Sequence, residues 1–311
     1  MKRIGIILFS IKLNSTSKKY DMAVIMVTGS KGQLGNEILG ISKKYIGHKF
    51  LFSDLDTLDL TKRPEVEKYI RNNKPEWIIN CAAYNFVDKA ESEEAEAFRI
   101  NDEAVRNISL TVRDSECRLI HFSSDFVFDG NSEKPYSEYS VARPLSAYGR
   151  SKLAGEKSAL LHPGTMVIRT SWLYSKFGNN FVKSILGLSE AREMLDVVND
   201  QEGSPTWAAD LANAVMTIIF SVNYQHKAFN TGIYHYSNGG SCTRAEFASE
   251  IVELSGNNCN IRGVSTAEYG NIAQRPRYSV LNSKKIIDNY GLEIPYWKDS
   301  LKKCMKEIKN K

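Results

Sequence analysis

Short apolar runs alternate with segments of helical periodicity through the first half of the chain. The runs that predict buried strands are Ala23–Val27, Phe50–Phe52, Trp77–Ile79, Arg118–Phe122 and Met166–Arg169. The segments that predict helices are Asn36–Lys44, Arg63–Asn72, Ala90–Val112 and Ala147–Leu161. Strands without internal polar alternation, separated by amphipathic helices, are typical of an α/β fold in which helices cover both faces of a parallel sheet. We therefore expect a Rossmann-type, doubly wound sheet with right-handed crossovers.

The alternation loosens after Arg169. The helices expected beyond this point are Phe181–Ala191, Asp210–Phe220, Thr243–Leu254 and Ser283–Asn289. The second of these is expected to return to the sheet, and the last two to belong to a smaller C-terminal lobe. The expected division is a dinucleotide-binding domain over residues 22–170, with a return at about 205–235, and a substrate-binding lobe formed by 171–204 and 236–311.

The first 21 residues stand apart from this pattern. An apolar run, Ile4–Phe9, follows Lys2-Arg3 and resembles a short signal-peptide core, but Lys12 interrupts it and no small-residue cleavage site follows. The first expected strand begins directly after Met22. We interpret residues 1–21 as an N-terminal extension, appended or misassigned, and expect a cytoplasmic protein.

Composition narrows the class of partner. The chain is 42% hydrophobic and 25% charged, and no apolar run approaches the roughly 20 residues of a membrane-spanning helix. The net charge of +5 is spread along the chain without the basic stripe of a nucleic-acid-binding protein. The five cysteines and five histidines are scattered and show no metal-ligand spacing. These features exclude membrane-spanning and nucleic-acid-binding roles, favour an anionic small-molecule substrate, and predict no metal site.

A glycine pattern lies between the first expected strand and helix. Gly29, Gly32 and Gly35 give the spacing GxxGxxG, a variant of the dinucleotide fingerprint. In that position glycines allow a tight turn, a close approach of the backbone to a pyrophosphate, and close packing of the helix whose N-terminus faces the anion. Lys31, Gln33 and Leu34 belong to the same turn and are expected to contact the cofactor as well.

Further cofactor contacts are expected at the ends of the next two strands. Asp54 follows the second strand, where a carboxylate would accept hydrogen bonds from the adenosine ribose. Asp59 and Leu60 are expected beside the adenine, and Ala82 and Ala83 where the third strand meets the cofactor. A carboxylate at position 54 favours NADH, whereas Lys31 would pair with the 2′-phosphate of NADPH. We therefore expect both cofactors to work, with a modest preference for NADH.

The candidate catalytic residues are Ser124, Tyr148 and Lys152. Tyrosine and lysine at positions i and i+4 share one face of a helix, so the ammonium can stabilise the phenolate and bring the phenol pKa nearer neutrality. Ser124 would hydrogen-bond the same carbonyl oxygen of a substrate. A YxxxK pair alone is more often an exposed helix turn, but here it follows the glycine turn and the serine in order. Together the three motifs predict hydride transfer to a carbonyl group.

These blocks resemble the extended short-chain dehydrogenase/reductases and, within them, the dTDP-4-dehydrorhamnose reductases. The resemblance covers most of the chain from Met22 onward. The blocks that carry it are Gly32–Gly35, Ile79–Tyr84, Val87–Glu91, Ser124–Gly130, Tyr148–Glu156, Arg169–Trp172, Asn199–Thr206 and Arg275–Leu281. The resemblance implies that Ser124 polarises the carbonyl, Tyr148 is the acid, and Lys152 tunes it and binds the ribose.

The resemblance also implies a substrate site formed by Asp125, Phe126, Trp172 and Arg275. The family more often has threonine and tyrosine where this chain has Ser124 and Phe126; serine keeps the hydroxyl, but Phe126 lacks a phenol that could touch the sugar. Trp172 resembles a sugar-contacting tryptophan and is equally compatible with a core position. Arg275 would suit a nucleotide diphosphate, and a structural arginine is a fair alternative. Some relatives use Mg²⁺ and form homodimers.

The function implied is reduction of the C4 keto group of dTDP-4-dehydro-6-deoxy-L-mannose by NADH or NADPH, which gives dTDP-L-rhamnose. One alternative is another nucleotide-sugar epimerase, dehydratase or reductase of the superfamily, although Phe126 stands where dehydratases usually have glutamate. Another is a non-catalytic regulatory subunit resembling that of methionine adenosyltransferase. The Tyr148–Lys152 pair argues for an enzyme.

Overall fold

The computed structural model describes residues 22–270 and 272–310; the expected N-terminal extension, 1–21, lies outside them. A six-stranded parallel sheet has the order β10-β5-β4-β3-β1-β2. Its strands are β1 (Val24–Thr28), β2 (Lys49–Ser53), β3 (Trp77–Asn80), β4 (Arg118–Ser124), β5 (Thr165–Thr170) and β10 (Gly232–His235). The strand order changes direction between β1 and β3, and this is where doubly wound sheets bind ligands. The expected fold class is confirmed.

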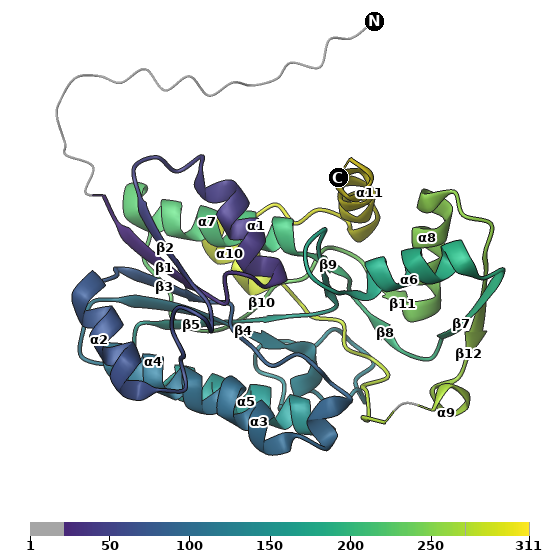
Figure 1. Ribbon diagram of the computed structural model, residues 1–311, viewed down its shortest axis with the longest axis horizontal. Helices are drawn as coiled ribbons and strands as arrows, with labels where there is room; N and C mark the ends of the chain where they lie inside the picture. The colour runs from purple at the N-terminus through teal and green to yellow at the C-terminus, as the bar shows by residue number, and fades with distance from the viewer. Residues whose placement is uncertain (1–21, 271, 311) are drawn as a thin grey trace, which may run out of the picture.

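Helices cover both faces of the sheet (Figure 1). One face packs on α1 (Gln33–Ser42), α7 (Ala208–Tyr224) and α10 (Lys284–Tyr290). The other packs on α2 (Arg63–Asn73), α4 (Ala104–Val112) and α5 (Ala147–Ala159), with α3 (Glu94–Phe98) beside α5. Burial of both faces explains why the strands are apolar throughout.

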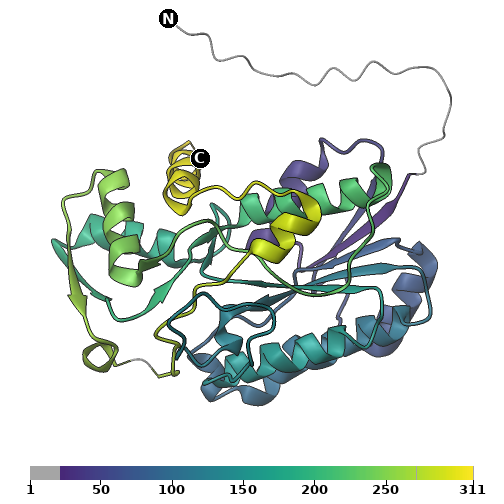
Figure 2. The same ribbon diagram turned by 180° about the vertical axis from the view of Figure 1, so that it is seen from behind.

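The remaining elements form a second lobe beside the carboxyl ends of the strands, seen from both sides in Figures 1 and 2. They are β6 (Leu173–Tyr174), α6 (Phe181–Ala191), β7 (Met194–Val198), β8 (Glu202–Gly203), β9 (Thr206–Trp207), β11 (Cys242–Thr243), α8 (Arg244–Ser255), β12 (Asn260–Val264), α9 (Thr266–Tyr269) and α11 (Trp297–Lys309). This lobe has its own core, in which Phe247 contacts the rings of Tyr174, Phe181 and Trp297. The domain boundaries given above stay a prediction.

The expected helix over Ala90–Val112 begins only at Glu94, and it is not a regular α-helix. The segment begins as a 3-10 turn at Lys89–Glu91 and continues as α3, a π-helical stretch at Arg99–Glu103, and α4. Asn101, in the wide π turn, accepts a hydrogen bond from the Tyr84 amide at 2.9 Å and donates to the Ser151 hydroxyl at 2.9 Å. These tertiary hydrogen bonds are formed within the π-helical stretch, and periodicity alone does not reveal them.

Small residues bring α5 against its neighbours. A Cβ on Gly149 would lie 2.3 Å from the Phe126 carbonyl oxygen, and one on Gly155 would lie 2.0 Å from that of Asn101. Ser146 caps the helix by accepting a hydrogen bond from the Gly149 amide. Close packing and the cap together fix the first turns of α5.

Over residues 22–270 and 272–310, every helix is too short or too polar to cross a membrane.

Candidate active site

The turn between β1 and α1 is built by close backbone contacts. Gly29 has a φ of 63°, and a Cβ there would lie 2.5 Å from the Ala82 amide nitrogen. A Cβ on Gly35 would lie 2.4 Å from the Gly29 carbonyl oxygen, so α1 packs directly on the turn. Gly32 is the N-cap of α1 and supplies no side-chain cap. The first amides of α1 therefore suit a phosphate group, as a dinucleotide would supply.

Asp54 is held beside this turn. Its carboxylate accepts hydrogen bonds from the Lys31 amide at 2.8 Å and the Leu55 amide at 2.9 Å. The Lys31 ammonium pairs instead with Asp56 at 2.7 Å, with both side chains well exposed. The carboxylate thus lies at the end of β2, where ribose binding needs it, and its role in binding stays a prediction.

The other expected cofactor residues differ in their burial and in their hydrogen-bond partners. Leu34 and Leu60 are buried in the cores on opposite faces of the sheet. Asp59 accepts hydrogen bonds from the Thr61 amide and hydroxyl. Gln33 faces the second lobe, where its side-chain oxygen accepts a hydrogen bond from Asn180 at 3.0 Å.

The segment after β3 closes the other side of the turn. The Ala82 amide donates to the Asn80 side chain at 3.2 Å, and the Ala83 carbonyl accepts a hydrogen bond from Asn85. Ala82 contacts the turn through the approach to Gly29 described above. Contacts of these residues with a cofactor stay predictions.

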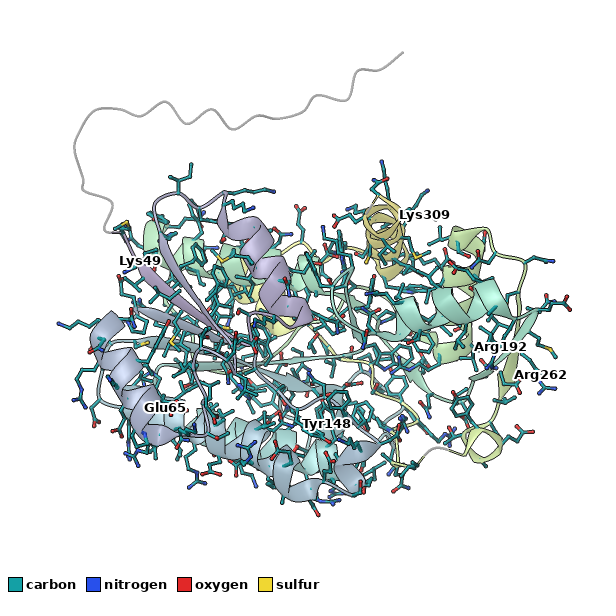
Figure 3. All side chains as sticks on the ribbon, viewed as in Figure 1. Lys49, Glu65, Tyr148, Arg192, Arg262 and Lys309 are labelled. Carbon is teal, nitrogen blue, oxygen red and sulfur yellow. The ribbon has the colours of Figure 1, made fainter. Side chains whose placement is uncertain are left out.

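The three candidate catalytic residues converge at the carboxyl end of β4. Ser124 ends the strand; its hydroxyl donates to Asp125 at 2.9 Å and accepts from the Phe126 amide at 3.2 Å. Tyr148 lies in the first turn of α5, at the end of that helix facing the second lobe (Figure 3). Lys152, one turn later, donates from Nζ to the Phe122 carbonyl oxygen at 2.7 Å.

Burial shifts the pKa values of Tyr148 and Lys152. It raises the pKa of the Tyr148 phenol, which the nearby Ser124 hydroxyl opposes and the Asp125 charge reinforces. The expectation that Lys152 brings this pKa nearer neutrality is wrong for the protein alone, because burial raises the Tyr148 pKa and the Lys152 ammonium donates to the Phe122 carbonyl instead. Burial also lowers the pKa of Lys152 to about 8, against the opposing charge of Glu156. Tyr148 is therefore protonated at neutral pH, as a proton donor must be.

The expected substrate residues lie around this trio. The Phe126 ring packs edge-on against Tyr148, with centroids 5.5 Å apart. Asp125 is buried, and burial raises its pKa while the Ser279 and Ser124 hydroxyls and the Arg244 charge lower it.

The two more distant substrate candidates have protein partners. Trp172, at a φ of 46°, packs against the backbone of Gly203 and beneath the Arg244 guanidinium. Arg275 donates two hydrogen bonds to Asp88, at 2.9 and 2.6 Å. Both substrate roles stay predictions.

Two polar residues of the site were not found by sequence reasoning. The Asn85 side-chain oxygen lies 3.5 Å from the Tyr148 hydroxyl, and Arg244 stacks on Trp172. The pattern Thr243-x-x-Glu246 marks a helix start and so predicts α8, whose capping box is present. Nothing in the sequence links that helix to Trp172.

Within the described part of the chain, no group of three or more His, Cys, Asp or Glu is arranged to hold a metal ion.

Comparison with known proteins agrees with the motifs. The dTDP-4-dehydrorhamnose reductase of Sinorhizobium fredii is 37% identical over 286 residues, which cover 90% of this chain and 96% of that protein. The dTDP-4-keto-6-deoxy-D-glucose reductase of Streptomyces niveus is 35% identical over 259 residues, covering 82% and 87%. The crystal structure of dTDP-4-dehydrorhamnose reductase from Bacillus anthracis in complex with NADP superimposes with a TM-score of 0.86 at 36% identity, covering 92% of this chain and 99% of that one. The model of the RmlD substrate binding domain family matches residues 22–310, and the chain belongs to that family.

Proposed function

We propose that the protein reduces the C4 keto group of dTDP-4-dehydro-6-deoxy-L-mannose with NADH or NADPH, and so produces dTDP-L-rhamnose. The observation that carries this proposal is the protonated, buried Tyr148 beside Ser124, at the strand ends that adjoin the glycine turn. The relatives reported above are reductases of 4-keto nucleotide sugars by name, and one was crystallised with NADP.

The cofactor and the protein would supply different parts of the reduction. A bound nicotinamide would supply the hydride to C4. Ser124 would donate its hydroxyl hydrogen to the C4 oxygen, in place of the hydrogen bond it now makes to Asp125. Tyr148 would transfer its phenolic proton to that oxygen as negative charge develops, so the ketone gains one hydride and one proton. Lys152 would offset the charge left on the phenolate.

A coupled assay tests the proposal. The upstream dehydratase and epimerase generate the keto sugar, and oxidation of NADH or NADPH is followed by absorbance. We expect cofactor oxidation that requires the keto sugar, and a product that co-elutes with dTDP-L-rhamnose. A correctly folded protein that oxidises neither cofactor would support the regulatory alternative. Oxidation with only the D-configured keto sugar would indicate the specificity named for the Streptomyces niveus relative.

The lowered pKa of Lys152 predicts an alkaline limit on activity. The charged ammonium is lost as pH rises through about 8, whereas Tyr148 keeps its proton. We expect kcat/KM to be level between pH 6 and 7 and to fall roughly tenfold per pH unit above 8. The profile of Lys152→Met is expected to be low and without this limb. A wild-type profile that stays level to pH 9.5 would contradict the assignment.

Asp54 is expected to set the cofactor preference. Its carboxylate, fixed by the Lys31 and Leu55 amides, would accept hydrogen bonds from a free ribose and repel a 2′-phosphate. We expect Asp54→Ala to shift the ratio of kcat/KM values toward NADPH by roughly 5- to 30-fold. Asp288→Asn, in an exposed ion pair on α10, is the control. If the wild type strongly prefers NADPH and Asp54→Ala leaves the ratio of kcat/KM values unchanged, the proposed binding of the ribose by Asp54 is contradicted.

We also propose, on the resemblance alone, that the protein is cytoplasmic and forms a homodimer. A native-mass measurement on the full chain tests the dimer: a mass of one chain at micromolar concentration would contradict it.

A further inference from the structure

Arg244 is held in place by aromatic rings at the edge of the candidate site. It is the first residue of α8, which the Thr243–Glu246 capping box anchors. Its guanidinium carbon lies 3.5 Å from the centroid of the Trp172 ring and 5.2 Å from that of Phe181. The guanidinium is therefore held against the face of the Trp172 ring by a cation–π contact.

Arg244 carries a charge that the described residues leave without an ion-pair partner. Burial lowers its pKa to about 10, so it remains a cation at neutral pH. Among residues 22–270 and 272–310, its guanidinium forms no hydrogen bond and no ion pair. The Asp125 charge acts on it from a distance, and the Oδ2 atom of Asp125 is itself buried without a hydrogen-bond partner. Arg244 is half-buried, and none of its guanidinium nitrogens is a buried atom without a partner, so its donors remain open to a ligand. A cation in this position binds an anion favourably.

Arg275 differs from Arg244 in each of these respects. Two of its guanidinium nitrogens bond the Asp88 carboxylate, and one of them also donates to the Ala273 carbonyl at 3.0 Å. Its charge is therefore neutralised within the protein. Arg275 thus has a carboxylate partner, whereas Arg244 forms no ion pair with any of the described residues.

We propose that Arg244 binds the diphosphate group of the nucleotide-sugar substrate. This inference rests on the proposed function, because it takes the reacting carbonyl to lie at Ser124 and Tyr148. In such a substrate the diphosphate is joined to the sugar carbon opposite the reacting C4, so it lies a pyranose ring away from those two hydroxyls. Ser124 pairs in register with Thr170, and Trp172, on which Arg244 stacks, follows Thr170 by two residues. The guanidinium has the planar donor set that binds two phosphate oxygens at once.

Binding of nucleotides to the intact protein saturated with NADP⁺ tests this inference without turnover. The probes are dTDP, which carries the diphosphate, and thymidine, which lacks it, both measured by calorimetry. We expect Arg244→Gln to weaken dTDP binding about 10- to 100-fold and to leave thymidine binding unchanged. Arg244→Lys, which keeps the charge but not the paired donors, is expected to fall between Arg244→Gln and the wild type. In turnover, KM for the keto sugar is expected to rise by a larger factor than kcat falls.

The control is Arg262→Gln. Arg262 is an exposed arginine of the same lobe, paired with Asp196 and far from Tyr148 (Figure 3), and its loss is expected to leave dTDP binding unchanged. Unaltered NADP⁺ affinity shows that a variant is folded. Equal dTDP affinity of Arg244→Gln and the wild type would overturn the inference, as would a wild type that binds dTDP no better than thymidine. An Arg244-dependent dTDP site in a protein without reductase activity would keep this inference and reject the proposed function.

Discussion

Replacement of Tyr148 by phenylalanine is expected to lower kcat by about 10²- to 10⁴-fold and to leave the Kd for NADH nearly unchanged. The substitution removes only the phenolic hydroxyl, and the ring that packs edge-on against Phe126 remains. The helix start that positions residue 148 is also unaltered, because Ser146 still caps α5. Steady-state kinetics and a fluorescence titration with NADH measure the two quantities separately.

The matched control is Tyr139→Phe, which removes a phenol from a side chain that is 87% exposed. It is expected to leave both kcat and Kd at wild-type values. Turnover by Tyr148→Phe close to that of the wild type would show that another group donates the proton, and Ser124 would then be the first residue to test.

Replacement of Glu156 by alanine is expected to reduce the free energy of unfolding by about 3–5 kcal/mol. Glu156 and Arg169 form an ion pair at 2.7 Å in which both side chains are almost fully buried, and the Glu156 carboxylate also accepts a hydrogen bond from Ser123 at 2.6 Å. Alanine would leave the Arg169 guanidinium buried without its counter-ion. Urea denaturation monitored by circular dichroism gives the difference.

The same substitution is also expected to change the pH dependence of kcat/KM. Glu156 lies one turn after Lys152 on α5, and its charge raises the pKa of that lysine. The alkaline limb of kcat/KM should therefore move below pH 8 in Glu156→Ala. The control is Glu94→Ala, which removes the exposed partner of Arg150, a residue on the same helix as Glu156. It is expected to reduce the free energy of unfolding by about 0–1 kcal/mol and to leave the alkaline limb unchanged. A loss below 1 kcal/mol in Glu156→Ala would contradict the role assigned to the buried pair.

The sheet could be predicted because strands that are buried on both faces consist of short, continuous apolar runs. The apolar runs from Ala23 to Arg169 correspond to β1–β5, and Phe181–Ala191 has the bounds of α6. The π-helical stretch before α4 could not be predicted, because Asn101 there forms hydrogen bonds with residues distant in sequence. Periodicity reports local geometry, and it does not report such tertiary contacts.

The positions of the candidate site residues could be predicted where local motifs indicate them, and their roles stay predictions. The glycine turn, Ser124, Tyr148 and Lys152 lie at the carboxyl ends of the strands, as their spacing indicated. The direction of the Tyr148 pKa was wrong because burial, which depends on the whole fold, outweighs the i, i+4 relation to Lys152. The stacking of Arg244 on Trp172 joins two separate segments of the second lobe and has no signature in either.

Transfer of deuterium from a reduced nicotinamide cofactor that carries two deuterium atoms on its reactive carbon tests the central claim most directly. The cofactor is supplied with the 4-keto sugar nucleotide, and the product is examined by mass spectrometry and NMR. The proposed reaction predicts one deuterium, on C4 of the rhamnosyl group, for each cofactor oxidised, and a much slower transfer by Tyr148→Phe. A product without deuterium, or one that carries it on a different carbon, would contradict the proposed reduction.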